Sequence, residues 1–249
     1  MIEIIDLVKN FGELTAVDHL NLEIKSGEFF AVLGPNAAGK TTTLKILAGL
    51  MKPGSGIARV NGFDVQTHPL DARRHMAFVP DFPFLYEKLT PWEFFRFTGQ
   101  LFGMPDVLIE LDARKLTDRF SLEPYLNKPI EGLSHGTKQR VAIVSALLHD
   151  PKVFIIDEPM VGLDPHHARI VKETLKERSR NGMTVLVSTH QLSVAEELAD
   201  RIGIMHLGRL VALGTADELR RQSGEGPLEN VFLALTRQEQ KTVEEKNSK

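Results

Sequence analysis

The feature that most constrains this chain is the stretch Gly34-Pro-Asn-Ala-Ala-Gly-Lys-Thr-Thr42, which matches the pattern G-x-x-x-x-G-K-[ST]. An apolar run at 29–33 precedes it and is typical of a buried strand, and leucines at helical spacing follow it as far as residue 50. A loop between a strand end and a helix start presents backbone N–H groups to phosphate oxygens. The stretch therefore predicts a phosphate-binding loop.

Two side chains carry the chemistry of this loop. We expect the Lys40 ammonium to reach the β- and γ-phosphates of a nucleotide, and the Thr41 hydroxyl to face Mg²⁺. A chance match to the pattern is expected in roughly one chain in a hundred of this length. The strand and the helix that flank the match favour the functional interpretation.

Composition excludes several classes of protein. A chain of 249 residues can form one large domain or two small ones, and it is long enough to bury a core. The net charge of −3 gives no support to nucleic-acid binding, and the absence of cysteine excludes disulfides and thiolate chemistry. The first residues lack the features of a signal peptide, and no apolar run is long enough to span a bilayer. We expect a soluble, cytoplasmic protein that reaches a membrane only through a partner.

Hydrophobic patterning predicts different structure in the N-terminal segment and in the middle of the chain. Alternation of apolar and polar residues over 1–33 predicts short antiparallel strands with turns at 10–12 and 26–27, and Asn61-Gly62 signals a hairpin. Residues 91–149 show helical spacing instead. The helical pattern is broken at 103–106, 123–124 and 128–129. We therefore expect a helical subdomain inserted into an α/β core.

Polar side chains follow the later apolar runs at 153–157 and 184–188. Asp157 and Glu158 end the first run, and His190 follows the second. Because such strands alternate with helices, we expect a parallel sheet with its site at the carboxyl ends of the strands. Asp157 fits a carboxylate that positions Mg²⁺, Glu158 can deprotonate a water molecule, and His190 can hydrogen-bond a γ-phosphate.

With these residues in this order, the chain closely resembles the ATP-binding subunit of a bacterial ABC transporter over about residues 1–220. Leu133-Ser-His-Gly-Thr corresponds to the family's Leu-Ser-Gly-Gly-Gln signature, and Gly162-Leu-Asp164 to the loop that contacts the opposite subunit. The resemblance implies an α/β fold of the P-loop NTPase type, with a RecA-like parallel-sheet core, an N-terminal antiparallel β subdomain and a helical subdomain at about 90–150. Residues 221–249 would be a C-terminal extension, and the charged tail from residue 238 is predicted to be disordered.

The resemblance also assigns a role to each matching residue. Glu158 would be the catalytic glutamate and His190 the switch histidine, while Thr41, Asp157 and Asp81 would serve the metal. The predicted ATP-binding residues are Phe11, Val17, Gly34, Pro35, Asn36, Ala37, Ala38, Gly39, Lys40, Thr41 and Thr42. The predicted contacts to the ATP of the opposite subunit are Ser134, His135, Gly136 and Thr137, with Asp164 in the dimer loop.

The chain departs from the family pattern at four of these positions. Ala37 replaces a glycine, and we expect binding to survive there if the position does not need a positive φ. His135 and Thr137 replace glycine and glutamine in the signature. Asp81 stands where the family usually has glutamine, so it could ligate Mg²⁺ but also adds negative charge beside phosphates.

The implied activity is ATP hydrolysis coupled to transport, with ATP and Mg²⁺ as cofactors. The partners would be a second ATP-binding subunit, in a homodimer or heterodimer, and a transmembrane permease that holds the chain at the inner face of the membrane. A weak match of the C-terminal segment to bacterial exporters favours export. A soluble ABC ATPase acting on ribosomes or DNA is the alternative. Such proteins usually have two ATP-binding units or a long coiled coil, whereas only about ninety residues separate loop and signature here, with no heptad run. A module that binds nucleotide without hydrolysis is disfavoured by the retained catalytic side chains.

An aromatic-rich segment follows Asp81. Trp92, Phe95 and Phe102 have helical spacing and are expected in the core of the helical subdomain. The aromatics that precede them are Phe82, Phe84 and Tyr86. They alternate with Pro83 and Leu85 in a segment too short for a helix, so we expect some of them to be exposed and to form the docking surface for the membrane partner.

Overall fold

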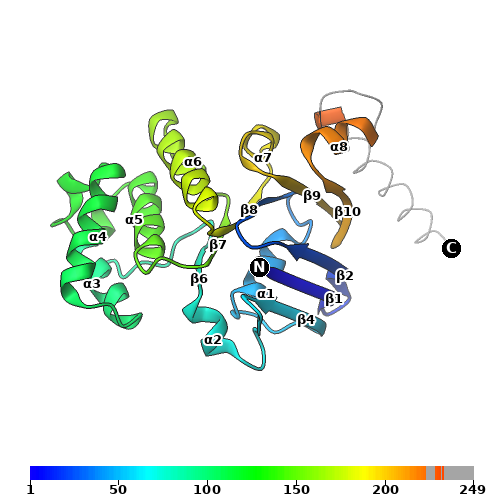
Figure 1. The fold of residues 1–249 in the computed structure, drawn as a ribbon, viewed down its shortest axis with the longest axis horizontal. Coiled ribbons are helices and arrows are strands. Elements are labelled where there is room, and N and C mark those ends of the chain that lie inside the picture. The colour runs from blue at the N-terminus through cyan, green and yellow to red at the C-terminus, as the bar shows by residue number, and fades with distance from the viewer. Residues whose placement is uncertain (223–227, 231, 233–249) are drawn as a thin grey trace.

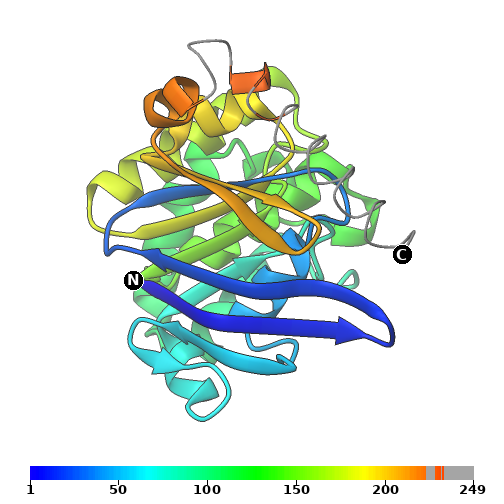
Figure 2. The same cartoon turned by 90° about the vertical axis from the view of Figure 1, so that its right-hand side faces the viewer.

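The computed structural model describes residues 1–222, 228–230 and 232, and it contains two β-sheets with helices between and around them (Figure 1). The first sheet is antiparallel, has the strand order β2-β1-β4-β5, and is seen most clearly in Figure 2. Its strands are β1 (Ile2–Phe11), β2 (Leu14–Ile24), β4 (Ser55–Val60) and β5 (Phe63–Asp64). The predicted N-terminal antiparallel subdomain and the Asn61-Gly62 hairpin are thereby confirmed.

The second sheet has the order β10-β9-β3-β8-β7-β6 and is parallel except for β10, which pairs antiparallel with β9. Its strands are β3 (Phe29–Leu33), β6 (Met76–Val79), β7 (Val153–Asp157), β8 (Thr184–Thr189), β9 (Arg201–His206) and β10 (Arg209–Gly214). The helices that accompany it are α1 (Lys40–Leu47), α2 (Pro69–Arg74), α6 (Pro165–Arg180), α7 (Leu192–Leu198) and α8 (Ala216–Gln222).

The sheet is covered on both faces around β3, β7 and β8, which explains the continuous apolar runs at 29–33, 153–156 and 185–187. Along β3, Phe29 packs in a cluster with residues of α5 and α6, whereas Phe30 packs in a second cluster with α1 and the antiparallel sheet. Phe154 and Ile155 on β7 divide in the same way. Helix α1 is therefore enclosed by the two sheets, and the loop that precedes it is held from both sides.

Helices α3 (Pro91–Leu101), α4 (Asp106–Arg119) and α5 (His135–Leu147) form the predicted helical subdomain at the end of the molecule away from the antiparallel sheet (Figure 1). Short 3₁₀ turns at Glu123–Tyr125 and Ile130–Gly132 link α4 to α5. The Ser134 side chain caps α5 by accepting a hydrogen bond from the Thr137 amide at 3.3 Å, as expected from the sequence. This cap fixes the start of α5 and with it the signature segment.

Two predictions about local structure were wrong. Strands β1 and β2 are not short but 10 and 11 residues long, because the pairing continues with a shifted register past irregularities that include positive φ at Asp6 and His19. The helix after the phosphate loop ends at Leu47 rather than near residue 50, since Gly49 adopts a φ of 67° and ends it. Leu50 consequently lies on the surface, with 66% of its area exposed.

One aromatic residue predicted in the core of the helical subdomain, Phe102, lies partly on the surface. Phe95 is fully buried, and Trp92 packs against the same cluster. Phe102 keeps 37% of its area exposed and stacks on His149 with ring centroids 3.6 Å apart. It lies at the C-terminal end of α3, where the helix no longer faces the subdomain core. The exposure expected of the preceding aromatics is confirmed, and Phe84 is 93% exposed.

Helix α8 crosses the predicted domain boundary at residue 220. The tail for which disorder was predicted, from residue 238, lies outside the described residues. Within the described part of the chain, none of the helices combines the length and the apolar character needed to span a bilayer.

The burial of Phe95 predicts a large loss of stability on truncation. Phe95→Ala should lower the free energy of unfolding by about 3–5 kcal/mol, because it removes a fully buried ring and leaves a cavity. Leu101→Ala on the same helix is the control, since Leu101 is 71% exposed and should change stability by less than about 0.5 kcal/mol. Urea unfolding of both variants measures the difference, and equal losses would contradict the described packing of α3.

Candidate active site

The phosphate loop runs from the end of β3 to the start of α1 and is packed closely between neighbouring backbones. A Cβ atom at Gly34 would lie 2.4 Å from the carbonyl oxygen of Met205, and one at Gly39 would lie 2.3 Å from that of Ala16. Gly39 also adopts a φ of 99°. Only glycine fits at these two positions, and their close packing fixes the path of the loop.

Lys40 is folded back over this loop. Its ammonium donates hydrogen bonds to the carbonyl oxygens of Gly34 and Pro35 at 2.6 and 2.9 Å, and only 6% of its area is exposed. Burial lowers the pKa of Lys40, while the Glu158 and Asp157 carboxylates oppose that shift. The lysine is thus a desolvated cation at the place where the loop motif expects phosphate oxygens.

The condition set for Ala37, that its position needs no positive φ, is not met. Its φ is 63°, so the position does use the left-handed conformation that glycine adopts without strain. An L-residue in this conformation costs about 1–2 kcal/mol. The loop nevertheless forms with alanine, which indicates that the contacts on either side of it hold the backbone in place.

Asp157 and Thr41 meet at the carboxyl end of β7. The Thr41 hydroxyl donates to Asp157 Oδ2 at 2.6 Å, and Asp157 is 1% exposed. Asp81 lines the same cavity, where its Oδ1 accepts a hydrogen bond from the Phe82 amide at 2.9 Å. Within the described residues, no three His, Cys, Asp or Glu side chains converge to hold a metal ion. A hydroxyl beside one or two carboxylates still fits Mg²⁺, which takes its remaining ligands from water and substrate phosphates.

Glu158 is held in one orientation by the strand that follows β7 in the sheet. Its Oε1 lies 2.7 Å from His190 Nδ1, and its Oε2 accepts a hydrogen bond from the Thr189 hydroxyl at 3.3 Å. The Glu158 backbone has a φ of 46°, a strained value for a non-glycine residue. The parallel pairing of β7 with β8 therefore brings the predicted catalytic pair together.

Lys40, Thr41, Asp81, Asp157 and Glu158 share one cavity of about 370 Å³, whereas His190 is not among the described residues that line it. Phe11 lines it with 47% of its area exposed, which suits a ring that stacks on a nucleotide base. Val17 does not line it: the residue is fully buried in the core beneath β2, because its side chain points to the opposite face of the strand from its neighbours. Ala16 and Leu207 line the cavity instead. The remaining predicted loop residues in the lining are Asn36, Ala37, Ala38, Gly39, Lys40, Thr41 and Thr42.

The signature residues lie elsewhere. None of Ser134, His135, Gly136 or Thr137 is among the described residues that line the cavity. Gly136 instead packs on the dimer loop, since a Cβ there would lie 2.4 Å from the Gly162 carbonyl oxygen.

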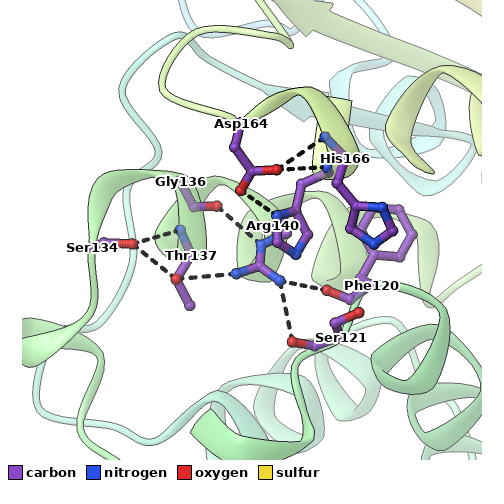
Figure 3. Close-up of polar contacts among 9 residues, drawn as sticks. Phe120, Ser121, Ser134, Gly136, Thr137, Arg140, Asp164 and His166 are labelled. Carbon is purple, nitrogen blue, oxygen red and sulfur yellow. Dashed lines mark hydrogen bonds and ion pairs between the residues drawn. The ribbon is translucent and has the colours of Figure 1, made fainter. Parts of the chain in front are cut away.

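Asp164 begins α6 and accepts hydrogen bonds from the His166 and His167 amides (Figure 3). A further hydrogen bond from the His167 ring, at 2.6 Å, is the main cause that lowers the pKa of Asp164 to about 2. Asp164 therefore stays ionised down to pH values below the usual range of a carboxyl group.

Comparison with protein families matches residues 17–161 to the model described as ABC transporter. The chain belongs to the ABC transporter family. It is 36% identical over 240 residues to "Probable multidrug ABC transporter ATP-binding protein YbhF" of Escherichia coli (strain K12), an alignment that covers 94% of this chain and 41% of YbhF. The chain therefore spans less than half the length of that relative.

Solved structures of ABC proteins share the fold. The structure of an ATP-binding subunit of an ABC transporter superposes with a TM-score of 0.90 at 36% identity, over 95% of this chain and 99% of that chain. A dimeric post-hydrolysis state of an ATP-binding cassette bound to ADP and Pi superposes with a TM-score of 0.78 at 28% identity, over 86% and 98%. The predicted identity as an ABC ATP-binding subunit and the predicted P-loop NTPase fold are confirmed.

Several residues of this ABC site were not predicted. Leu14, Ala16 and Leu207 line the cavity near Phe11, but each is one of many apolar residues and carries no motif. Leu207 reaches the cavity only because β9 pairs with β3, a contact between segments far apart in the sequence. No sequence signal could have singled it out.

The strain at Ala37 predicts an unusual effect of a glycine substitution. Ala37→Gly should leave the free energy of unfolding unchanged or raise it by up to about 1 kcal/mol, because relief of the left-handed backbone offsets the extra freedom of the unfolded chain. Ala48→Gly makes the same chemical change at a φ of −71° and should cost about 1 kcal/mol. Urea unfolding compares the two, and equal destabilisation would argue against a positive φ at position 37.

Proposed function

We propose that this ABC subunit binds ATP with Mg²⁺, hydrolyses it between two subunits that face head to tail, and thereby drives a separate transmembrane permease in export. The observation that carries this proposal is the arrangement of Glu158 and the Asp157–Thr41 pair around the cavity that contains the phosphate loop, with His190 hydrogen-bonded to Glu158. A nucleotide with its phosphates on the loop would place its terminal phosphate among these groups. A relative named for export, the Nod factor export ATP-binding protein I of Ralstonia nicotianae, is 36% identical over 213 residues and supports export.

In this proposal Glu158 is the general base. Its carboxylate can accept a proton from a water molecule that attacks the γ-phosphate, and the hydrogen bond to His190 orients it for that step. A neutral imidazole donates from only one nitrogen, so His190 can donate to both Glu158 and a phosphate only as the imidazolium.

Mg²⁺ would be held by Asp157 and Thr41, with Asp81 as a further carboxylate in the same cavity. When bound, the ion neutralises phosphate charge and polarises the γ-phosphate. Three carboxylates line this cavity against one lysine, so an added cation also offsets the repulsion between carboxylates and phosphates.

A second ATP-binding subunit completes the site. The signature segment of one chain lies outside its own nucleotide cavity, so it is free to contact ATP held by another chain. The dimeric ATP-binding cassette that shares this fold supports that arrangement. ATP would drive closure because it binds the closed dimer more tightly than the open one.

The permease would dock in a groove of about 280 Å³ beside the nucleotide site. The groove is lined mainly by apolar residues, among them Phe78, Phe84, Leu85, Phe94, Phe102 and Ala142. Its lining includes Pro80 and Pro83, on either side of Asp81 in the sequence, so movement at the nucleotide could be transmitted to a docked segment. Docking there would hold the chain at the inner face of the membrane.

Glu158→Gln tests the catalytic assignment. The amide keeps the shape of the side chain but cannot accept a proton, so kcat should fall on the order of a hundredfold or more while ATP binding persists. Glu173→Gln is a matched control on the exposed surface of α6 and should keep wild-type turnover. Steady-state ATPase assays and ATP titrations give both quantities, and near wild-type turnover of Glu158→Gln would refute the assignment.

Phe84→Ala tests the docking groove. The ring lines the groove and is 93% exposed, so its loss should weaken association with the membrane subunit by about 1–4 kcal/mol and leave ATP binding by the free subunit intact. Leu111→Ala on α4 is the control, because Leu111 is exposed but lies outside the groove. Co-purification of the chain with its transmembrane subunit is the measurement. Normal pairing of Phe84→Ala would place the docking site elsewhere.

A further inference from the structure

A buried chain of polar contacts leads to the Ser134 hydroxyl of the signature (Figure 3). Arg140 Nη2 donates to Thr137 Oγ1 at 3.2 Å, and Thr137 Oγ1 lies 2.9 Å from Ser134 Oγ. Thr137 and Arg140 are only 4% and 5% exposed, whereas Ser134 is exposed. The contacts therefore run from the interior of the helical subdomain to the surface that carries the signature.

The donors present limit the direction of the hydroxyl protons. A guanidinium group has only donors, so the Thr137 oxygen must accept the bond from Arg140. Either hydroxyl can donate across the contact between Thr137 and Ser134. In the direction from Thr137 to Ser134, the Ser134 oxygen accepts both the Thr137 hydroxyl and the Thr137 amide, the latter at 3.3 Å. Both of its acceptor positions are then filled, and its own proton points outward.

We propose that Thr137 and Arg140 are positioning residues that preset the Ser134 hydroxyl as a hydrogen-bond donor to the phosphate oxygens of ATP held by the second subunit. The proposal rests on the function proposed above. A donor that needs no reorientation suits an anionic ligand, because hydrogen bonds to charged acceptors are the stronger ones. Thr137 is one of the departures from the family signature, so this arrangement is a property of this chain.

Arg140 is held in one place by further hydrogen bonds. Its Nη1 donates to the carbonyl oxygens of Phe120 and Ser121 at 2.6 and 3.1 Å, and its Nε donates to that of Gly136 at 3.4 Å. These bonds tie the end of α4 to the start of α5. A rigid buried cation at one end of this series of hydrogen bonds polarises the hydroxyl groups that follow it in the same direction.

The opposite direction makes a different prediction. If the Ser134 hydroxyl donated to Thr137, the serine proton would be engaged inside the protein, and loss of the threonine hydroxyl would free it. Thr137→Val would then leave hydrolysis unchanged or improve it. Under the proposal the same change frees the Ser134 proton to turn inward or to solvent and weakens the contact with ATP.

The contacts from Arg140 through Thr137 to Ser134 form a hydrogen-bond relay. Four variants and the wild type test this relay by steady-state ATP hydrolysis. Thr137→Val removes the hydroxyl at nearly constant shape and should lower kcat/KM about tenfold, the usual effect of losing one hydrogen bond to a charged group. Thr137→Ser keeps the hydroxyl and should stay within about twofold of wild type. Ser134→Ala should lower kcat/KM at least as much as Thr137→Val. The double variant should equal Ser134→Ala, because the threonine acts only through the serine.

Controls separate this relay from a structural effect. Affinity of the free subunit for a fluorescent ATP analogue should be unchanged in all variants, since the phosphate loop is distant from the relay. If Thr137→Val does not fold, Thr137→Ala replaces it in the same comparisons.

Three results would overturn the relay: wild-type activity of Thr137→Val, equal loss in Thr137→Ser and Thr137→Val, or multiplied losses in the double variant. A Ser134→Ala variant with full activity would refute the proposed contact of Ser134 with ATP. Loss of activity in Ser134→Ala with none in Thr137→Val would refute the relay alone.

Discussion

The close approach of the phosphate loop to its neighbours is the constraint on which the site depends. The loop passes between β2 and the end of β9 so closely that a Cβ at Gly34 or Gly39 would overlap a carbonyl oxygen of one of them. Gly208, in the turn after β9, donates from its amide to Ala38 and accepts a hydrogen bond from Asp18. The two sheets are thus joined at the loop through backbone atoms. Because α1 starts from this junction, the position of the nucleotide cavity is set by both sheets together.

Charge is the second determinant of the site. Lys40 and Asp157 are almost fully buried, and desolvation of such groups is unfavourable unless they have partners. Here the lysine is bonded to carbonyl oxygens and the aspartate to the Thr41 hydroxyl. These bonds hold Lys40 and Asp157 in place without an ion pair between them. The Lys40 ammonium can therefore still bind ligand oxygens, and the Asp157 carboxylate can still bind a cation. The same separation would allow the proposed Mg²⁺ to lie beside a bound nucleotide.

How much could be predicted from the sequence depended on how local each interaction is. The caps at Ser134 and Asp164 are contacts within four residues, and the residue types alone indicated them. The burial of Val17 was not predicted, because a shift of one residue along a strand reverses the side chain. Arg140 also carried no signal, since its partners Phe120 and Ser121 lie about twenty residues away and are bound through their backbones. Motifs record chemistry that side chains perform, and they miss backbone partners and pairings across the sheet.

Both signature residues that depart from the family pattern, His135 and Thr137, make contacts of their own. The His135 ring lies so close to Gly162 that a Cβ atom on residue 162 would be 2.2 Å from His135 Cδ2. The centroids of the His135 and Phe82 rings are 5.9 Å apart. His135 therefore touches both the dimer loop and the segment after Asp81. Thr137 in turn bonds inward to Arg140. A larger residue at position 135 is accommodated only because position 162 is glycine. His135 and Thr137 thus hold the signature against the rest of its own subunit, while Ser134 remains exposed and Gly136 packs on the dimer loop.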